Sequence, residues 1–340
     1  MAEKPSAIEE LRKRMERVEP LEGEPEFFTN PETLVRFLKA REWDLDKAEK
    51  LLKNAVEWRR KNKPLTMDCR WCHEKPGFHN MRQVGFDEMG RPVIYSCFAQ
   101  ASSRRNNVDD SIAHATYLIE NAKVTMKPGI HTWVFIIDCT GMTVPACSPK
   151  LGYGVTQVMS NHYPERLGLV ICLNHNALFQ GVWKAIKVFL HQNTVAKVKF
   201  VRSKQKILDV FHEYFNEELT DWLITEIKRN KTRPLTASQK QFWKTDPVHD
   251  PRGTPSYVAK YVEPYAAKSL CNLKELHKPH PNIVDECKGD VQPISAISSA
   301  DLELDDQLGD LDLDKSDDEN GVAEIEISEE FQIPKDAEHL

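Results

Sequence analysis

Short apolar segments alternate with helical segments through the middle of the chain, and no other feature of the sequence constrains the fold as strongly. Such alternation is typical of an α/β layer whose strands pair in parallel. The apolar segments lack a strict alternation of polar and apolar residues, which favours strands covered on both faces. The expected strands are residues 91–99, 132–139, 167–174 and 196–201.

Helical patterns flank this layer on both sides. Residues 7–62 carry apolar residues at helical spacing, Asp44 is placed to cap the last helix of this region, and Pro64 ends it. A further helix over residues 217–230 closes the layer. The expected fold class is α/β, with an N-terminal helical bundle followed by a domain with a mostly parallel sheet. The expected organisation is a helical module over 1–75, an α/β ligand-binding domain over 76–235, an irregular extension over 236–300 and a disordered acidic tail over 301–340.

The net charge of −6 is distributed unevenly along the chain. Residues 301–340 carry 16 acidic and two basic side chains, so the rest of the chain carries a net charge of +8. A basic body favours an anionic partner, either a membrane surface or a nucleic acid. The like charges of the tail repel one another, which predicts disorder. We see no secretory signal and no apolar run long enough to span a membrane, so we expect a cytoplasmic protein.

The chain has eight cysteines, which we expect to be reduced because their spacing is irregular and no export signal is seen. Cys69, Cys72 and His73 form a single C-x-x-C-H pattern, with His79 as the nearest further ligand. Without a second C-x-x-C, this pattern favours linker packing over a metal or haem site. No nucleotide-binding or nucleophile motif is present, and Asp138 at a strand end lacks an acid–base partner. We therefore expect no catalytic residues, no metal, no cofactor and no enzymatic activity.

Polar side chains precede the last two expected strands. Glu165 comes just before the strand at 167–174, and Thr194 and Lys197 come just before the strand at 196–201 or at its start. The helix between these strands makes a crossover, so the strands are parallel, and their beginnings meet at one edge of the sheet. The three side chains form either a ligand site or a simple surface ion pair. This edge lies opposite the usual ligand crevice of α/β sheets, which argues against a nucleotide.

The connecting helix over residues 177–190 is apolar on more than one face. A helix of this kind is either buried in a core or in contact with lipid. The sequence pattern by itself leaves both interpretations open.

Three segments of the sequence resemble those of a known protein family. They are "LVRFLKAREWDLDKAEKLLKNAVEWRR", "GFDEMGRPVIY" and "YPERLGLVICLNHNALFQGVWKAIKVFLHQNTVAKVKFV". Together they resemble the N-terminal module and the lipid-binding domain of the CRAL-TRIO family over roughly residues 30–230. The last segment is similar to the phosphatidylinositol-transfer branch of that family.

The resemblance implies a set of ligand-binding residues. In the phosphatidylinositol-transfer branch the matching positions read the lipid headgroup, and here they are Arg41, Glu165, Thr194 and Lys197. Arg41 and Lys197 would supply cationic donors for a phosphodiester. Thr194 would add a hydroxyl, and Glu165 would accept from inositol hydroxyls while orienting Lys197.

The resemblance also implies a mobile gate helix over the lipid tails. Its expected contact residues are Phe179, Val182, Trp183 and Ile186. The expected function is therefore a cytosolic carrier that holds one phosphatidylinositol and exchanges it at a transient membrane surface, with no nucleic acid involved.

Two alternatives remain open. Trp133 and Phe135 stand where phosphatidylcholine-binding members have small hydroxyl residues, which allows a carrier of another hydrophobic ligand, such as a sterol, a tocopherol or a retinoid. Residues 25–32, "PEFFTNPE", resemble the acidic two-phenylalanine motif that adaptor domains of the endoplasmic reticulum read. The competing interpretation is that Phe27 and Phe28 pack into the helical bundle.

Overall fold

The computed structural model describes residues 4–67, 81–100, 108–143, 149–236 and 239. The chain divides into two units, residues 1–291 and 292–340, and every described residue belongs to the first. The Cys69–His73 pattern, most of the expected extension and the whole acidic tail lie outside the described residues.

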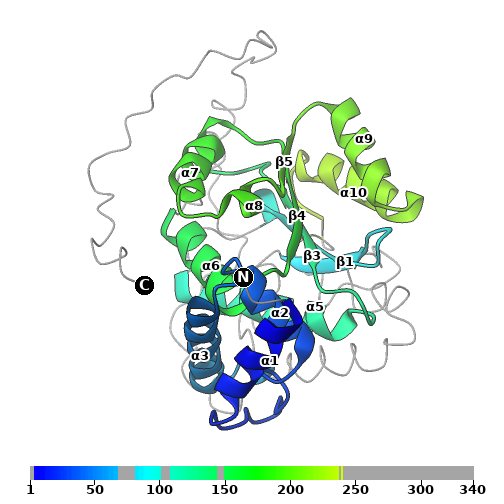
Figure 1. Ribbon diagram of the computed structural model, residues 1–340. Helices are drawn as coiled ribbons and strands as arrows, with labels where there is room; N and C mark the ends of the chain where they lie inside the picture. Colours follow the sequence, from blue (N-terminus) through cyan, green and yellow to red (C-terminus); the bar gives the residue numbers. More distant parts are fainter. Residues whose placement is uncertain (1–3, 68–80, 101–107, 144–148, 237–238, 240–340) are drawn as a thin grey trace, which may run out of the picture. The chain divides into compact units, whose positions relative to one another are not determined.

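Three helices form the N-terminal module: α1 (Lys4–Met15), α2 (Pro31–Lys39) and α3 (Leu45–Asn62) (Figure 1). The side chain of Asn30 caps α2 by accepting a hydrogen bond from Glu32 N. Asp44 caps α3 by accepting one from Lys47 N at 3.0 Å, so the predicted cap is confirmed. Apolar side chains from all three helices are buried against one another and form the core of this module.

The two-phenylalanine segment packs into the same module. Phe28 is only 3% exposed, and the Phe27 ring meets the Phe37 ring edge-on at 6.3 Å. The Arg59 guanidinium lies over the Phe27 ring, 4.7 Å from its centroid. Of the two interpretations of this segment, packing into the helical bundle and an adaptor motif, the structure supports packing for both phenylalanines.

Five strands form one sheet in the order β1-β2-β3-β4-β5. They are β1 (Arg82–Phe86), β2 (Pro92–Cys97), β3 (Trp133–Asp138), β4 (Leu167–Leu173) and β5 (Val198–Val201). Strands β2 to β5 pair in parallel, which confirms the expected mostly parallel sheet. Strand β1 pairs antiparallel with β2 and is absent from the sequence prediction. The turn between them is held by Asp87, whose side chain accepts hydrogen bonds from Met89 N and Arg91 N.

Helices cover both faces of the sheet (Figure 1). The 3-10 turns η1 (Pro64–Thr66) and η2 (Phe98–Gln100) follow α3 and β2. Right-handed crossovers between successive parallel strands place the connecting helices on one face. These helices are α5 (Val108–Thr125), α6 (Pro149–His162), α7 (Ala177–Lys187) and the short α8 (Gln192–Val195). The other face is covered by α9 (Lys204–Tyr214) and α10 (Glu217–Asn230).

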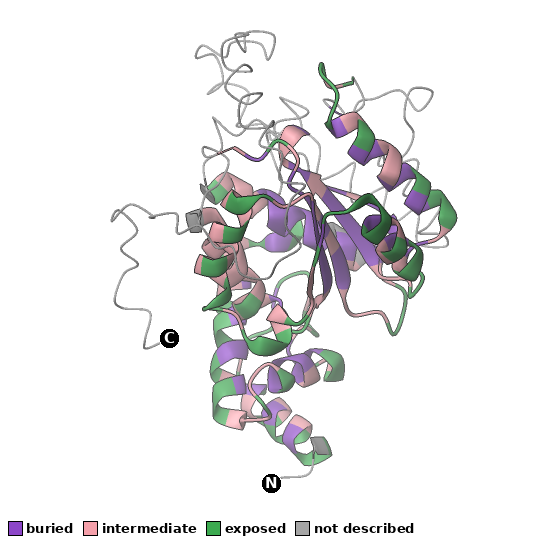
Figure 2. Cartoon of the chain, turned by 90° about the horizontal axis from the view of Figure 1, so that it is seen from above, coloured by how far each residue is buried: buried purple, intermediate pink, exposed green. Residues whose placement is uncertain are grey.

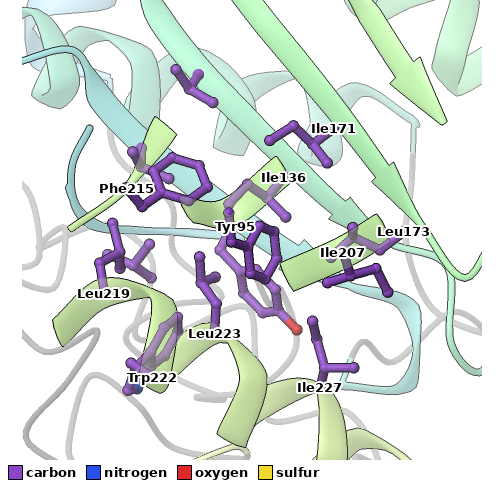
Figure 3. Close-up of a cluster of buried hydrophobic side chains, with 14 of the residues drawn as sticks. Tyr95, Ile136, Ile171, Leu173, Ile207, Phe215, Leu219, Trp222, Leu223 and Ile227 are labelled. Atoms are coloured by element: carbon purple, nitrogen blue, oxygen red, sulfur yellow. The ribbon is translucent and has the colours of Figure 1, made fainter. Parts of the chain in front are cut away.

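The face under α9 and α10 is filled by a continuous apolar core (Figure 3). The rings of Trp222 and Tyr95 are fully buried and meet edge-on at 5.6 Å. Phe211 on α9 is fully buried as well. Figure 2 shows that the strands of the sheet are largely buried (purple), whereas the outer helices alternate between buried, intermediate and exposed residues.

The opposite face, under α6 and α7, is covered less completely. Trp133 is 1% exposed and packs against Tyr163, with the ring centroids 6.2 Å apart. Further along β3 on the same face, Phe135 and Ile137 stay half-buried, and Phe200 on β5 is 38% exposed. Their neighbours on the α9 and α10 face are buried. The sheet therefore presents a filled face and a partly accessible apolar face.

A buried polar network surrounds Asp138 at the end of β3. Its carboxylate accepts hydrogen bonds from Thr140 N at 3.0 Å, Asn174 Nδ2 at 2.9 Å and Asn230 Nδ2 at 2.7 Å. The turn that follows requires Gly141, because φ is +73° and a Cβ would lie 2.7 Å from the backbone of Ala99. Asp138 thus holds the turn that follows β3.

Candidate functional site

Glu165 and Lys197 meet at the edge where β4 and β5 begin. Their side chains form an ion pair, with Glu165 Oε2 and Lys197 Nζ 3.9 Å apart. Val170 N donates to Lys197 O at 2.9 Å, which fixes the start of β5 beside β4. Both side chains remain partly accessible, at 38% and 27% of their surface. The structure therefore brings together the pair that the parallel strands predict.

The backbone at Glu165 adopts the left-handed conformation, with φ at +56°. A residue with a Cβ holds this conformation at a cost of about 1–2 kcal/mol, so the surroundings must enforce it. The preceding Tyr163 supplies such an anchor, because its buried hydroxyl donates to Glu120 Oε1 at 2.6 Å. On the other side, the Arg166 guanidinium donates to His131 O at 3.0 Å. The turn is clamped at both ends, and Glu165 alone of its residues is exposed.

Thr194 lies in α8, directly before the start of β5. Its carbonyl accepts a hydrogen bond from Lys197 N at 3.1 Å, and its own N–H donates to His191 O at 2.8 Å. One helical turn therefore separates the Thr194 and Lys197 side chains. This short helix is absent from the sequence prediction, which placed Thr194 before the strand without assigning it to an element.

Arg41 lies just beyond the end of α2, in the loop that leads to α3. Its guanidinium donates to Ala40 O at 2.9 Å, and burial lowers its pKa. In the described part of the chain it contacts no carboxylate. The next residue, Glu42, lies 3.4 Å from His191 Nε2 at the start of α8. The Arg41 loop is thus beside the helix that carries Thr194, although the Arg41 side chain does not touch the other three.

Helix α7 carries the expected gate residues, and none of its residues is buried. Phe179, Val182, Trp183 and Ile186 all have intermediate exposure. The rings of Phe179 and Trp183 face Phe200 on β5, with centroids 6.2 and 5.5 Å away. The helix is capped by Asn176, whose side chain accepts from Phe179 N at 3.0 Å.

The other side of α7 rests on α6. Gly152 allows this approach, because a Cβ there would collide with Ile186 Cδ1. The Tyr153 and Phe189 rings meet edge-on at 5.2 Å. Apolar contacts of half-buried side chains hold α7 in place.

The sequence analysis did not identify a buried charge cluster behind the Glu165 turn. Arg59 contacts Glu24 and lies 3.0 Å from Glu120, which also binds Lys123 at 2.7 Å. Arg59 and Glu120 are 2% and 4% exposed. The only signal in the sequence was a pair of opposite charges, Glu120 and Lys123, three residues apart at the end of the mostly apolar segment 112–123.

The described residues hold no group of three or more histidine, cysteine or acidic side chains that could bind a metal. Cys97, Cys139 and Cys172 are free and buried, as expected for reduced thiols. Burial raises the pKa of Cys172 to about 12, so this thiol stays protonated. In the described part of the chain, no helix is long and apolar enough to cross a membrane.

Comparison with known proteins identifies two domains. Residues 81–221 match the CRAL/TRIO domain, and residues 7–54 match the CRAL/TRIO N-terminal domain, together more than half of the chain. A CRAL-TRIO domain-containing protein of Schizosaccharomyces pombe is 31% identical over 54% of this chain and 43% of its own. The SEC14 cytosolic factor of Eremothecium gossypii is 26% identical, over 58% of this chain and 68% of its own.

A third relative carries an explicit activity in its name. The phosphatidylinositol transfer protein CSR1 of Eremothecium gossypii is 24% identical over 58% of this chain and 50% of its own. The chain spans less than half the length of several of its curated relatives.

Proposed function

Because the chain belongs to the CRAL-TRIO family of lipid-binding proteins, we propose that it holds one phosphatidylinositol and exchanges it at membranes. The observation that carries this proposal is the Glu165–Lys197 pair at the edge where β4 and β5 begin. Such a pair offers a cation for a phosphodiester and a carboxylate for inositol hydroxyls within one site. A surface ion pair at 3.9 Å contributes little to stability, so binding is the better account of its placement.

Thr194 and Arg41 complete the proposed headgroup site. Thr194 adds a hydroxyl one helical turn from Lys197. Arg41 reaches the site through its loop, which Glu42 and His191 hold against α8. Arg41 would supply a second cation for the phosphate, and in the described structure it has no carboxylate partner to give up.

The partly accessible face of the sheet supports the proposed position of the acyl chains. Phe135, Ile137 and Phe200 retain accessible apolar surface there, and α7 faces Phe200 without burying any of its own residues. Burying roughly thirty methylenes at about 0.8 kcal/mol each would offset the loss of the membrane environment. Transfer then needs no energy-consuming chemistry and no catalytic residue.

Native mass spectrometry and lipid extraction of the purified full-length protein test the proposal directly. We expect a single bound phospholipid whose headgroup is inositol. A bound sterol, tocopherol or retinoid would instead favour the alternative that Trp133 and Phe135 allow. We do not propose an adaptor role for residues 25–32, because Phe28 would have to leave the core of the helical module.

Replacing both Phe179 and Trp183 with alanine should slow lipid exchange more than it weakens equilibrium binding. These side chains would meet the bilayer when α7 opens, yet neither is buried in the closed protein. We expect the free energy of unfolding to fall by about 1 kcal/mol at most. Stopped-flow transfer of a fluorescent phosphatidylinositol and urea denaturation measure the two effects.

Trp222→Ala is the matched control, because Trp222 is fully buried on the opposite face. It should cost about 3–5 kcal/mol of stability through the cavity it leaves. If the α7 variant behaved like this control and exchanged lipid at the normal rate, α7 would be a structural element and the gate assignment would be wrong.

Deleting residues 301–340 should increase binding to anionic vesicles at low salt. The tail carries 16 acidic side chains, which an anionic bilayer repels and which screen the net positive charge of the rest. The gain should shrink as ionic strength rises, because salt screens both effects. Vesicle sedimentation of full-length and truncated protein is the measurement. Equal binding of both at low salt would mean that the tail has no role in membrane affinity.

A further inference from the structure

A small cavity is lined by Tyr163, Pro164 and Arg166 of the turn that carries Glu165, and Lys197 is not part of its lining. It is lined by α2 and the segment before it, α3, α5, the end of α6 and the turn itself, and its volume is about 10 Å³, roughly one water molecule. Its nitrogen-bearing side chains are all cationic or imidazole, and none of its lining residues is acidic. They are Arg36, Arg59, Lys123, His162 and Arg166.

Two of these cations are paired within the cluster already described. Arg59 contacts Glu24 and Glu120, and Lys123 binds Glu120 at 2.7 Å. Two carboxylates thus balance two cations. The hydroxyl of Tyr163 occupies a further position on Glu120, so this carboxylate has little capacity left for other donors.

The remaining two guanidiniums have only neutral acceptors. Arg36 is 8% exposed and donates to Thr33 Oγ1 at 2.8 Å. Arg166 donates to His131 O at 3.0 Å and contacts Met126 Sδ at 3.7 Å. Among the described residues, no carboxylate lies within ion-pair distance of either group. The exposed Glu32 attracts both guanidiniums and the buried Glu120 attracts Arg166, but Glu32 contacts His131 at 3.4 Å and Glu120 contacts Arg59 and Lys123.

Burial of these cations without a carboxylate at ion-pair distance is costly, and the pKa values of both guanidiniums are lowered. Burial, together with repulsion from Arg166, lowers the pKa of Arg36 to about 9. Burial likewise lowers the pKa of Arg166. Burial and the charge of Arg59 lower the pKa of His162 to about 4, so its imidazole is neutral at pH 7, and its Nδ1 has no partner in the described structure. The cavity is lined mainly by cationic donors and by no carboxylate, which is the arrangement that an anion requires.

We propose that this cavity is a binding site for one monatomic anion of chloride size, held between the guanidiniums of Arg36 and Arg166. The volume selects the class of ligand, because a phosphate or a lipid headgroup has several heavy atoms and does not fit. The site is distinct from the proposed headgroup site and does not depend on which lipid the protein carries. Its occupant joins α2 of the helical module to the turn before β4.

Thermal unfolding of the full-length protein in sodium chloride, sodium bromide and sodium gluconate tests this, at a constant ionic strength of about 0.15 M. We expect the midpoint to be about 2–4 °C higher in chloride and bromide than in gluconate, saturating with halide concentration. Arg36→Gln should remove this halide-specific increment. Arg60→Gln, which alters an exposed guanidinium on α3, should retain it.

A second measurement needs no variant and so stands even if Arg36→Gln fails to fold. Crystals grown in bromide should show an anomalous peak within hydrogen-bonding distance of both Arg36 and Arg166. Equal thermal unfolding midpoints in all three salts would overturn the proposal. A water at this position without any anomalous signal from bromide would overturn it as well.

Discussion

Lys197→Ala and Glu165→Lys should each abolish phosphatidylinositol transfer between donor and acceptor vesicles while leaving unfolding cooperative. Each hydrogen bond to a charged group contributes about 1.5–3 kcal/mol, so its loss lowers affinity by about 10- to 150-fold. Glu165→Lys also places a second cation beside Lys197, which adds repulsion. Neither side chain belongs to the core, since both are partly accessible at the edge of the sheet.

Lys199→Ala provides a matched control for this prediction. Lys199 lies on β5, two residues from Lys197, and forms an ion pair with Glu213 at 3.2 Å. It resembles Lys197 in charge and exposure but faces α9 rather than the Glu165 turn. Normal transfer is therefore expected for Lys199→Ala. If Lys197→Ala transferred lipid as well as this control does, the headgroup assignment would be wrong.

Glu120→Gln should cost about 3–5 kcal/mol of unfolding free energy, because it leaves Arg59 and Lys123 buried with one carboxylate fewer. The change preserves the shape of the side chain, so the loss would be electrostatic. Urea denaturation at pH 7 measures it. Glu57→Gln, at an exposed position on α3, should change stability by about 0.5 kcal/mol or less. If the two variants had similar free energies of unfolding, the charge cluster would make no net contribution to stability.

The same cluster predicts acid sensitivity. Although burial opposes it, attraction to Lys123 and Arg59 lowers the pKa of Glu120 to about 2, below its ordinary 4.5. Its contribution to stability is therefore present above pH 4.5 and is lost as the pH falls from 4.5 towards 2. The pKa of His162 is lowered from 6.5 to about 4, so as the pH falls the unfolded chain takes up this proton before the folded protein does. His162 therefore also lowers stability as the pH falls from 6.5 to 4. Glu120→Gln should therefore reduce the dependence of stability on pH between 4.5 and 2, and should leave the dependence between 6.5 and 4.5 unchanged.

The elements with strong sequence patterns were predicted correctly, whereas those held by local chemistry were missed. Helices α6 and α10 occupy the expected residues, because continuous apolar periodicity specifies them. Strand β1 escaped prediction because it is only five residues long and includes Gly85, so its identity depends on pairing with β2. Helix α8 is a single turn capped by His191, too short for any period to reveal.

The part of the proposed site that the parallel pairing of strands determines could be predicted from the sequence. Parallel neighbours begin at one edge, so Glu165 and Lys197 had to converge, and the ion pair confirms that they do. Arg36 and Arg166 could not be placed together in this way. Their approach depends on how α2 docks against the turn before β4, and no local pattern encodes such docking. The left-handed backbone of Glu165 was equally invisible, because distant contacts of Tyr163 enforce it.

The order of the strands has a kinetic consequence. From β1 to β5 each strand lies beside the next one in the chain, so the order never reverses and there is no switch point among the strands that the structure describes. Open α/β sheets with a switch point keep a standing crevice there, into which a ligand diffuses. If the lipid lies between the sheet and α7, as proposed, its entry requires α7 to move away from α6 and Phe200. Uptake would then be limited by that opening rather than by encounter with the bilayer, and its rate would level off as the concentration of vesicles rises.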